Sequence, residues 1–182
     1  MKNDEEHLIE RCKRNDQRAC KELYDRYAPQ MFGVCMRYSQ SKEAAEEVLH
    51  DGFIKVFNGL ERIKDAKKLG GWIRSVMIHT ALRAAKEEKA LPHVEINEQS
   101  EGLILESEDI LSRLDIHIIL SAIQKLPSKY RSAINLCMID GYNYGEAAKI
   151  LGVEEVTVRT NIVRARASLA DMLKGYYDLR DK

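Results

Sequence analysis

The 182-residue sequence lacks several features that would assign it at once to a class of protein. It has no net charge, because 29 acidic side chains balance 29 basic ones, and this alone argues against a strongly basic nucleic-acid-binding protein. No apolar run approaches the roughly 20 residues that span a bilayer, and no apolar signal segment is present. We therefore expect a cytoplasmic protein that is not embedded in a membrane.

Cysteine is scarce and unclustered. The four residues Cys12, Cys20, Cys35 and Cys137 show neither CxxC spacing nor clustered histidine partners. There is no HExxH motif and no nucleophile with a nearby base in sequence. We expect reduced thiols, no metal site, no cofactor, no catalytic residues and no small-molecule substrate. A small helical enzyme or metal protein that uses His50 and His79 is the weaker alternative.

The zero net charge hides an uneven distribution along the chain. Residues 1–89 carry 18 basic and 15 acidic side chains, residues 90–115 carry 1 and 7, and residues 116–182 carry 10 and 7. Two mildly basic ends therefore flank an acidic middle. Either end could approach phosphates, whereas the middle would be repelled by them.

Helical periodicity dominates the first 89 residues. The pattern predicts helices over 5–14 and 17–38, separated by a stop and a new N-cap at Asn15-Asp16, and a kink or break in the second at Pro29. A third helix is predicted from about residue 42 to residue 57, with a polar outer strip. Residues 60–71, which are basic and end in Gly70-Gly71, are predicted to form a loop or a broken helix end, and a fourth helix follows from Trp72.

The stretch 144–166 has the pattern of a helix-turn-helix. Apolar residues fill one face of a short helix, Gly152 can adopt the left-handed conformation that ends it, and a second helix starts within a few residues. Val158 and Ile162 point inward, which leaves Arg159 and its polar neighbours for base edges and phosphates.

The predicted fold is therefore all-α, with two small helical domains joined by an acidic flexible linker. The boundaries are 1–89 for the first domain, 90–110 for the linker and 111–182 for the second domain, which contains the helix-turn-helix. A plain solvated tether is the simplest interpretation of the linker.

Several motifs, in this order and spacing, resemble the bacterial RNA polymerase sigma factors of the extracytoplasmic-function (ECF) type in the sigma-70 family. The matching pieces are Asp16-Gln17-Arg18-Ala19, Leu23-Tyr24-Asp25-Arg26-Tyr27, the run 45–57, Trp72-Ile73-Arg74, Leu126-Pro127, Asp140-Gly141-Tyr142 and the run 157–166. The resemblance covers most of residues 8–89 and 112–173. It implies a non-catalytic subunit that directs RNA polymerase to promoters and helps to melt them.

The resemblance also implies three functional surfaces. The first binds core RNA polymerase through the clamp coiled coil of its largest subunit, and its candidates are Glu46, Glu47, His50, Asp51, Phe53 and Lys55. The second recognises and melts the −10 element, and its candidates are Lys64, Lys67, Lys68, Trp72, Arg74, His79, Thr80, Arg83 and Lys86. The third reads the −35 element, and its candidates are Tyr144, Thr157, Arg159, Thr160, Asn161, Val163, Arg164 and Arg166.

Three positions depart from the family pattern. The family often has Gln where His50 stands, Asn where His79 stands and a basic residue where Asn161 stands. The family further implies an anti-sigma factor as a partner, and an acidic linker that threads toward the polymerase active-site channel. The alternative function is a stand-alone helix-turn-helix regulator whose N-terminal helices dimerise or sense a signal.

Overall fold

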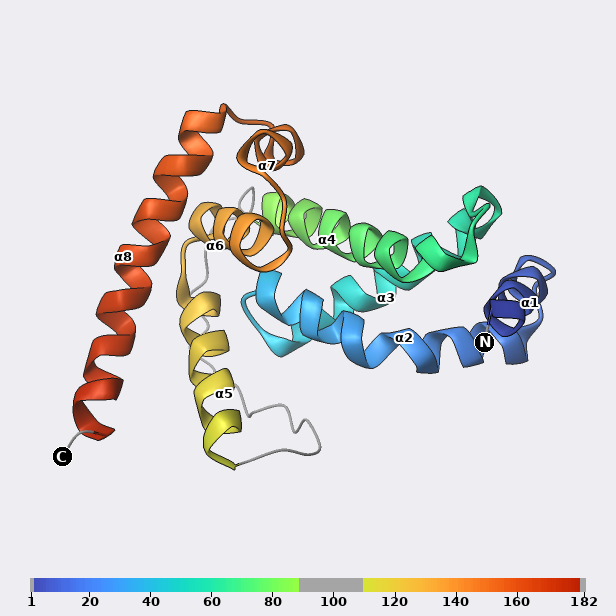
Figure 1. Cartoon of the computed structure of the whole chain (residues 1–182), viewed down its shortest axis with the longest axis horizontal. Helices are drawn as coiled ribbons and strands as arrows, with labels where there is room; N and C mark the ends of the chain where they lie inside the picture. Colours follow the sequence, from blue (N-terminus) through green and yellow to red (C-terminus); the bar gives the residue numbers. More distant parts are fainter. Residues whose placement is uncertain (1, 89–109, 181–182) are drawn as a thin grey trace.

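The computed structural model describes residues 2–88 and 110–180, and all regular elements in these two ranges are helical (Figure 1). The N-terminal half contains α1 (Lys2–Lys13), α2 (Gln17–Tyr38), α3 (Lys42–Gly59), the short turns η1 (Leu60–Arg62) and η2 (Ala66–Lys68), and α4 (Leu69–Glu88). The C-terminal half contains α5 (Ile110–Lys125), α6 (Ser128–Ile134), the π-helical turn η3 (Asn135–Ile139), α7 (Tyr144–Leu151) and α8 (Glu155–Arg180). The predicted all-α, two-domain architecture is confirmed.

The N-terminal half is a bundle in which α2, α3 and α4 pack against one another and α1 crosses the start of α2. Its core is apolar and almost fully buried, with Leu23, Met31, Val56, Ile73 and Met77 at 0–1% exposure. Gly52 on α3 lets α4 approach closely, because a Cβ at this position would lie 2.2 Å from the sulfur of Met77. The bundle therefore depends on a small residue at this crossing.

The predicted N-cap between the first two helices is confirmed. The Asp16 carboxylate accepts hydrogen bonds from the backbone N–H groups of Arg18 (2.9 Å) and Ala19 (3.2 Å). Arg11 donates to the same carboxylate from the end of α1, with an Nε–Oδ2 distance of 2.9 Å. The hydrogen bond from Arg11, together with those from the backbone, lowers the pKa of Asp16. This one side chain therefore joins α1 to α2.

Two sequence predictions about the N-terminal half are wrong in part: α2 has no break at Pro29, and residues 60–71 are not a single loop. α2 runs through Pro29 without interruption, because Pro29 and Asp25 one turn earlier are both exposed and water can replace the missing hydrogen bond. Two 3₁₀ turns fill the first part of residues 60–71, and α4 already begins at Leu69 and so includes Gly70 and Gly71.

The helix-turn-helix forms as predicted. α7 begins at a capping box, in which the backbone N–H groups of Asn143 and Glu146 each donate to the other residue's side-chain oxygen at 2.9 Å. It ends at Gly152, whose φ is +68°. α8 then packs along α5, α6 and α7, as its long course beside them shows (Figure 1). Ala147, Val158 and Ile162 lie at 0–3% exposure between the two helices of the motif.

The two halves of the chain touch each other. α2 contacts α5 and α6, and buried residues of both halves belong to one apolar cluster that includes Ala133 and Leu136. The predicted linker 90–110 lies outside the described residues, except that Ile110 opens α5. The exact domain boundaries stay a prediction.

In the described ranges, no helix is both long enough and apolar enough to cross a membrane.

Candidate nucleic-acid interface

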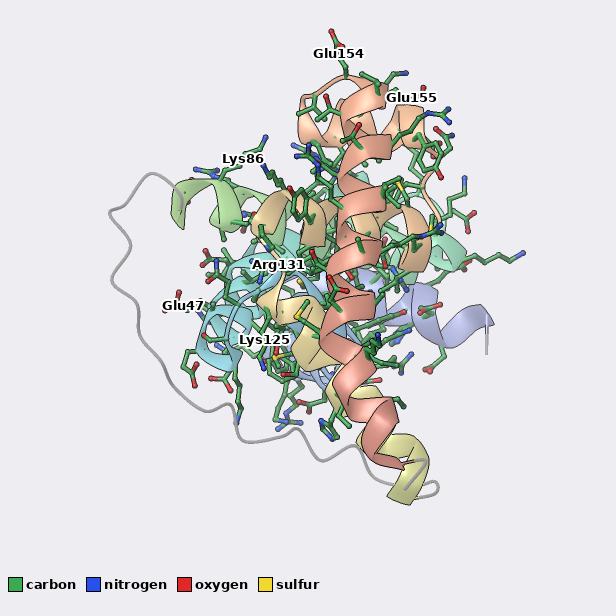
Figure 2. The ribbon with its side chains drawn as sticks, turned by 90° about the vertical axis from the view of Figure 1, so that its left-hand side faces the viewer. Glu47, Lys86, Lys125, Arg131, Glu154 and Glu155 are labelled. Carbon is green, nitrogen blue, oxygen red and sulfur yellow. The ribbon has the colours of Figure 1, made fainter. Side chains whose placement is uncertain are left out.

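The exposed start of α8 forms the first candidate surface. Glu154 and Glu155 lie at the outer tip of the molecule, where the turn enters α8 (Figure 2). The first turns of α8 expose Thr157, Arg159, Thr160 and Val163, the last of which is 67% exposed. The helix-turn-helix thus presents a free helix end of the kind that enters a DNA major groove.

Arg159 is held in place by two neighbours. Its Nη2 lies 2.5 Å and its Nε 3.2 Å from Oε1 of Glu155, one helical turn earlier. Its guanidinium carbon lies 4.6 Å from the ring centroid of Tyr144, at the start of α7. The stack and the ion pair fix the direction of a long side chain and so lower the entropy lost when it binds.

Two residues of this surface are absent from the sequence prediction. Glu155 orients Arg159, and the i, i+4 spacing of the pair is a signal that could have found it. Val156 is 61% exposed beside them, and an exposed aliphatic residue at this position suits the methyl group of thymine. It was missed because sequence reasoning assigns an aliphatic residue to the core.

Other members of the predicted set have different surroundings. Asn161 is only 8% exposed, because α8 packs against three helices and buries a wide stripe. The exposed Arg164 and Arg166 turn back toward α6 and η3: Arg164 donates to the Tyr130 hydroxyl (3.4 Å), and Arg166 contacts the sulfur of Met138 (3.0 Å). The hydrogen bond from Arg164 lowers the pKa of Tyr130.

The exposed face of α4 forms a second candidate surface. His79, Arg83 and Lys86 are exposed at i, i+4 and i+7, and therefore lie along one side of the helix. Arg83 donates to Glu87 (2.8 Å), and this hydrogen bond raises the pKa of Arg83. Thr80 differs from the prediction because it is 5% exposed and accepts a hydrogen bond from Lys55 (3.1 Å).

The segment before α4 adds cations and one aromatic ring. Lys64, Lys67 and Lys68 are exposed on and beside the two 3₁₀ turns. Trp72 is half-buried and covers Gly59, the last residue of α3, where a Cβ would lie 2.9 Å from the indole ring. The ring therefore packs where α3 ends and α4 begins, and part of it remains accessible.

Arg74 has a partner that the sequence did not indicate. It pairs with the carboxylate of Asp140, which lies between η3 and α7 in the other half of the chain. Arg37 pairs with the same carboxylate, at an Nη2–Oδ1 distance of 2.9 Å, and the Tyr38 hydroxyl donates to it at 2.6 Å. Burial, and then the Asp140 carboxylate, raise the pKa of Tyr38, so its hydroxyl keeps the proton that it donates.

The outer face of α3 forms the third candidate surface. Glu46, Glu47, His50, Asp51 and Lys55 are exposed along this helix. Figure 2 shows Glu47 on the same outer side of the N-terminal half as Lys86 of α4. Phe53 is a correction to the prediction: it is 2% exposed, and its ring packs against Tyr24 with a centroid distance of 4.6 Å, so it belongs to the core.

No cluster of three or more His, Cys, Asp or Glu side chains within residues 2–88 and 110–180 could hold a metal ion. The three surfaces carry side chains that suit binding to DNA or to a protein. Cations face outward on α4, an arginine and two threonines face outward at the start of α8, and a mixed acidic and imidazole face lies on α3.

Comparison with known proteins agrees with this organisation. Residues 23–90 match the family model described as Sigma-70 region 2, and residues 116–169 match that of Sigma-70 region 4. The ECF RNA polymerase sigma factor SigW of Bacillus subtilis is 26% identical over 177 residues, which cover 91% of this chain and 95% of the relative. The ECF RNA polymerase sigma-E factor of Escherichia coli K12 is 28% identical over 173 residues, covering 89% and 90%.

Solved structures share the fold. The sigma factor RpoE of Bartonella quintana, in a co-crystal with the anti-sigma factor NepR, aligns with a TM-score of 0.51 at 20% identity, covering 85% of this chain and 96% of that one. CnrH in complex with the cytosolic domain of CnrY aligns with a TM-score of 0.52 at 21% identity, covering 92% and 96%. With both sigma-70 regions matched in order, and with relatives matched over about nine-tenths of either chain, the chain belongs to the sigma-70 family of RNA polymerase sigma factors, in its ECF group.

Proposed function

We propose that this chain is a promoter-specificity subunit, which binds core RNA polymerase, recognises the −35 and −10 promoter elements and helps to melt the DNA. The observation that carries the proposal is the presence of two exposed helix faces with arginine and other polar side chains, one on α8 and one on α4, in separate halves of one chain. Two such faces match two separated DNA elements. The subunit itself is non-catalytic, and phosphodiester synthesis belongs to the core enzyme.

The −35 element is read by the start of α8 in the major groove. Arg159 is the side chain that contacts a base or an adjacent phosphate, with Thr157, Thr160 and Val163 beside it. Tyr144 and Glu155 orient Arg159 before it meets DNA. Asn161 supports the helix from its buried side.

The −10 element is bound and opened by α4 and the turns before it. His79, Arg83 and Lys86 follow one strand along the exposed face, and Lys64, Lys67 and Lys68 attract its phosphates. The accessible part of Trp72 offers a surface on which an unstacked base can rest.

Core RNA polymerase is bound by the outer face of α3, against the clamp coiled coil of the largest subunit. Glu46, Glu47, His50 and Asp51 are free to pair with cations and amides of a partner helix. Because the net charge of the chain is zero, its affinity for promoter DNA relies on this larger assembly. The protein works in the cytoplasm, and an anti-sigma factor is its expected regulator, since RpoE of Bartonella quintana was crystallised with one.

The test is in vitro transcription with purified core polymerase on genomic fragments, followed by mapping of the start sites. We expect starts that depend on this chain and share two upstream sequence elements. A pattern no different from that of core enzyme alone would contradict the proposal. Tight promoter binding by a free dimer, without core polymerase, would favour the stand-alone regulator instead.

A further inference from the structure

The contact between the two halves is built around one buried carboxylate. The side chain of Asp140 has no exposed surface, although it lies in a turn between two helices. Arg37 at the end of α2 and Arg74 on α4 both pair with it, and Tyr38 donates its hydroxyl proton to it. Two cations therefore face a single anion.

The N-terminal half supplies all three donors. Among the described residues, neither Arg37 nor Arg74 forms a second salt bridge, and the buried Nε of Arg37 has no hydrogen-bond partner. Without Asp140, the end of α2 and the second turn of α4 would hold two guanidinium groups and a phenol hydroxyl close together. This set of donors suits an anion with several oxygen atoms, of which a phosphate is the best match.

The contacts around this carboxylate are also polar. Gln124 donates to the carbonyl oxygen of Met36 (3.0 Å), and Asn135 donates to that of Arg37 (2.7 Å). These carbonyl groups belong to the last turn of α2, where a helix leaves acceptors without partners. Water can replace such bonds at a modest net cost, so these hydrogen bonds add little to the apolar packing that joins the halves.

In the closed chain, in which the two halves are in contact, the two DNA-binding surfaces are too close together to reach both promoter elements. Arg74 pairs with Asp140, and Tyr144, only four residues after Asp140, stacks on Arg159. The guanidinium groups of Arg74 and Arg159 therefore lie within about 30 Å of each other by chain reach and side-chain length. Elements centred near −35 and −10 are about 25 base pairs apart, which is roughly 85 Å along B-form DNA. The halves must therefore separate before both elements are bound.

We propose that Arg37, Tyr38 and Arg74 form an anion site that a promoter backbone phosphate occupies in the open chain, and that Asp140 fills this site in the closed chain as an internal competitor. The inference rests on the proposed function. DNA is favoured over an acidic protein because Arg74 lies on the same helix as His79, Arg83 and Lys86. Closure and DNA binding by this site exclude each other.

The decisive test compares variants on the two sides of the ion pair. Asp140→Asn removes the competitor and should raise the affinity of the holoenzyme for promoter DNA by roughly three- to tenfold. Arg37→Ala also opens the chain but removes a phosphate contact, so affinity should fall and the slope of log affinity against log salt should shrink by about 0.9. The matched controls are Asp171→Asn and Arg18→Ala, at exposed positions. Neither substitution should change the DNA affinity or the salt slope.

A purely structural contact between the halves predicts a different result. Both variants would then open the chain and move the affinity in the same direction, with an unchanged salt slope, and this would overturn the proposal. Gln124→Ala weakens docking without touching the anion site, and should raise affinity with the wild-type salt slope. If Asp140→Asn fails to fold, Gln124→Ala can be compared with Arg37→Ala in its place.

The free chain gives a readout that does not depend on polymerase. Asp140→Asn should bind a single-stranded DNA oligonucleotide more tightly than the wild type, and adding Arg37→Ala should abolish this gain. A gain for a polyglutamate peptide without a gain for DNA would overturn the phosphate assignment in favour of an acidic protein partner. If the wild-type holoenzyme selects no promoter, the proposed function fails, while the oligonucleotide result still decides the anion site.

Discussion

The guanidinium group of Arg159 lies over the ring of Tyr144, 4.6 Å from its centroid, and is paired with Glu155 at 2.5 Å. The first helix of the motif thus contributes the ring, and the second contributes the cation. This links the angle between the two helices to the direction in which the arginine points. A change in either helix would misdirect Arg159.

Arg159→Ala should reduce binding to a promoter by about 1–3 kcal/mol if Arg159 reads a guanine through two hydrogen bonds. The loss should vanish on a promoter that carries a different base at the contacted position. Binding of the holoenzyme to a panel of −35 sequences measures this, with Lys174→Ala, exposed farther along α8, as the control. An equal loss on all sequences would make Arg159 a phosphate contact.

The double change of His50 and Asp51 to alanine should weaken association with core polymerase by about 1–3 kcal/mol, because both side chains lie exposed on the face proposed for the clamp. Thermal stability should stay within about 0.5 kcal/mol of wild type, since surface positions contribute little to it. Titration of labelled protein with core enzyme measures the change. Asn58→Ala, exposed at the far end of α3, should bind normally, and a similar loss there would argue against a localised surface.

Gly52→Ala should destabilise the N-terminal bundle by about 1–3 kcal/mol, because the added methyl group meets the buried sulfur of Met77. Gly33→Ala is the matched control, since a Cβ there meets nothing within 4 Å. The free energy of unfolding of this control should rise by about 0.5–1 kcal/mol, because alanine is a better helix former than glycine. Urea unfolding of both variants is the measurement, and an unchanged midpoint for Gly52→Ala would mean that Met77 moves aside freely.

Acid should weaken the junction of α1 and α2. Arg11 and the backbone hold the pKa of Asp16 below its ordinary value, so this carboxylate adds stability above the unfolded-state pKa near 3.9. That stability is lost as the pH falls through the lower folded-state pKa. Between pH 7 and pH 2, the free energy of unfolding should therefore fall less steeply below about pH 4 for Asp16→Asn than for the wild type. Parallel profiles would contradict this assignment.

Local patterns were enough to predict most of the helices and the helix ends at Asp16 and Gly152. Each acts on neighbours within a few residues, and its chemistry is visible in the sequence. The outward direction of Arg159 likewise followed from the inward direction of Val158 and Ile162.

Features set by tertiary packing were not predictable in this way. Asn161 is buried because α8 contacts three helices instead of one, and no local period reveals how many neighbours a helix has. The pairing of Arg37 with Asp140 joins positions 103 residues apart. Pro29 interrupts a helical pattern in the sequence, yet α2 continues through it, because Pro29 and Asp25 lie on the exposed side of the helix.

Trp72 gives the molecule a built-in optical reporter. It is the sole tryptophan of the chain, and its half-buried ring covers Gly59 where α3 ends and α4 begins. The junction connects α3, whose outer face is proposed to bind polymerase, to α4, whose exposed face is proposed to bind the −10 element. Intrinsic emission excited at the indole band therefore comes from one known location, and its wavelength and quenching would follow solvent access there without any added label.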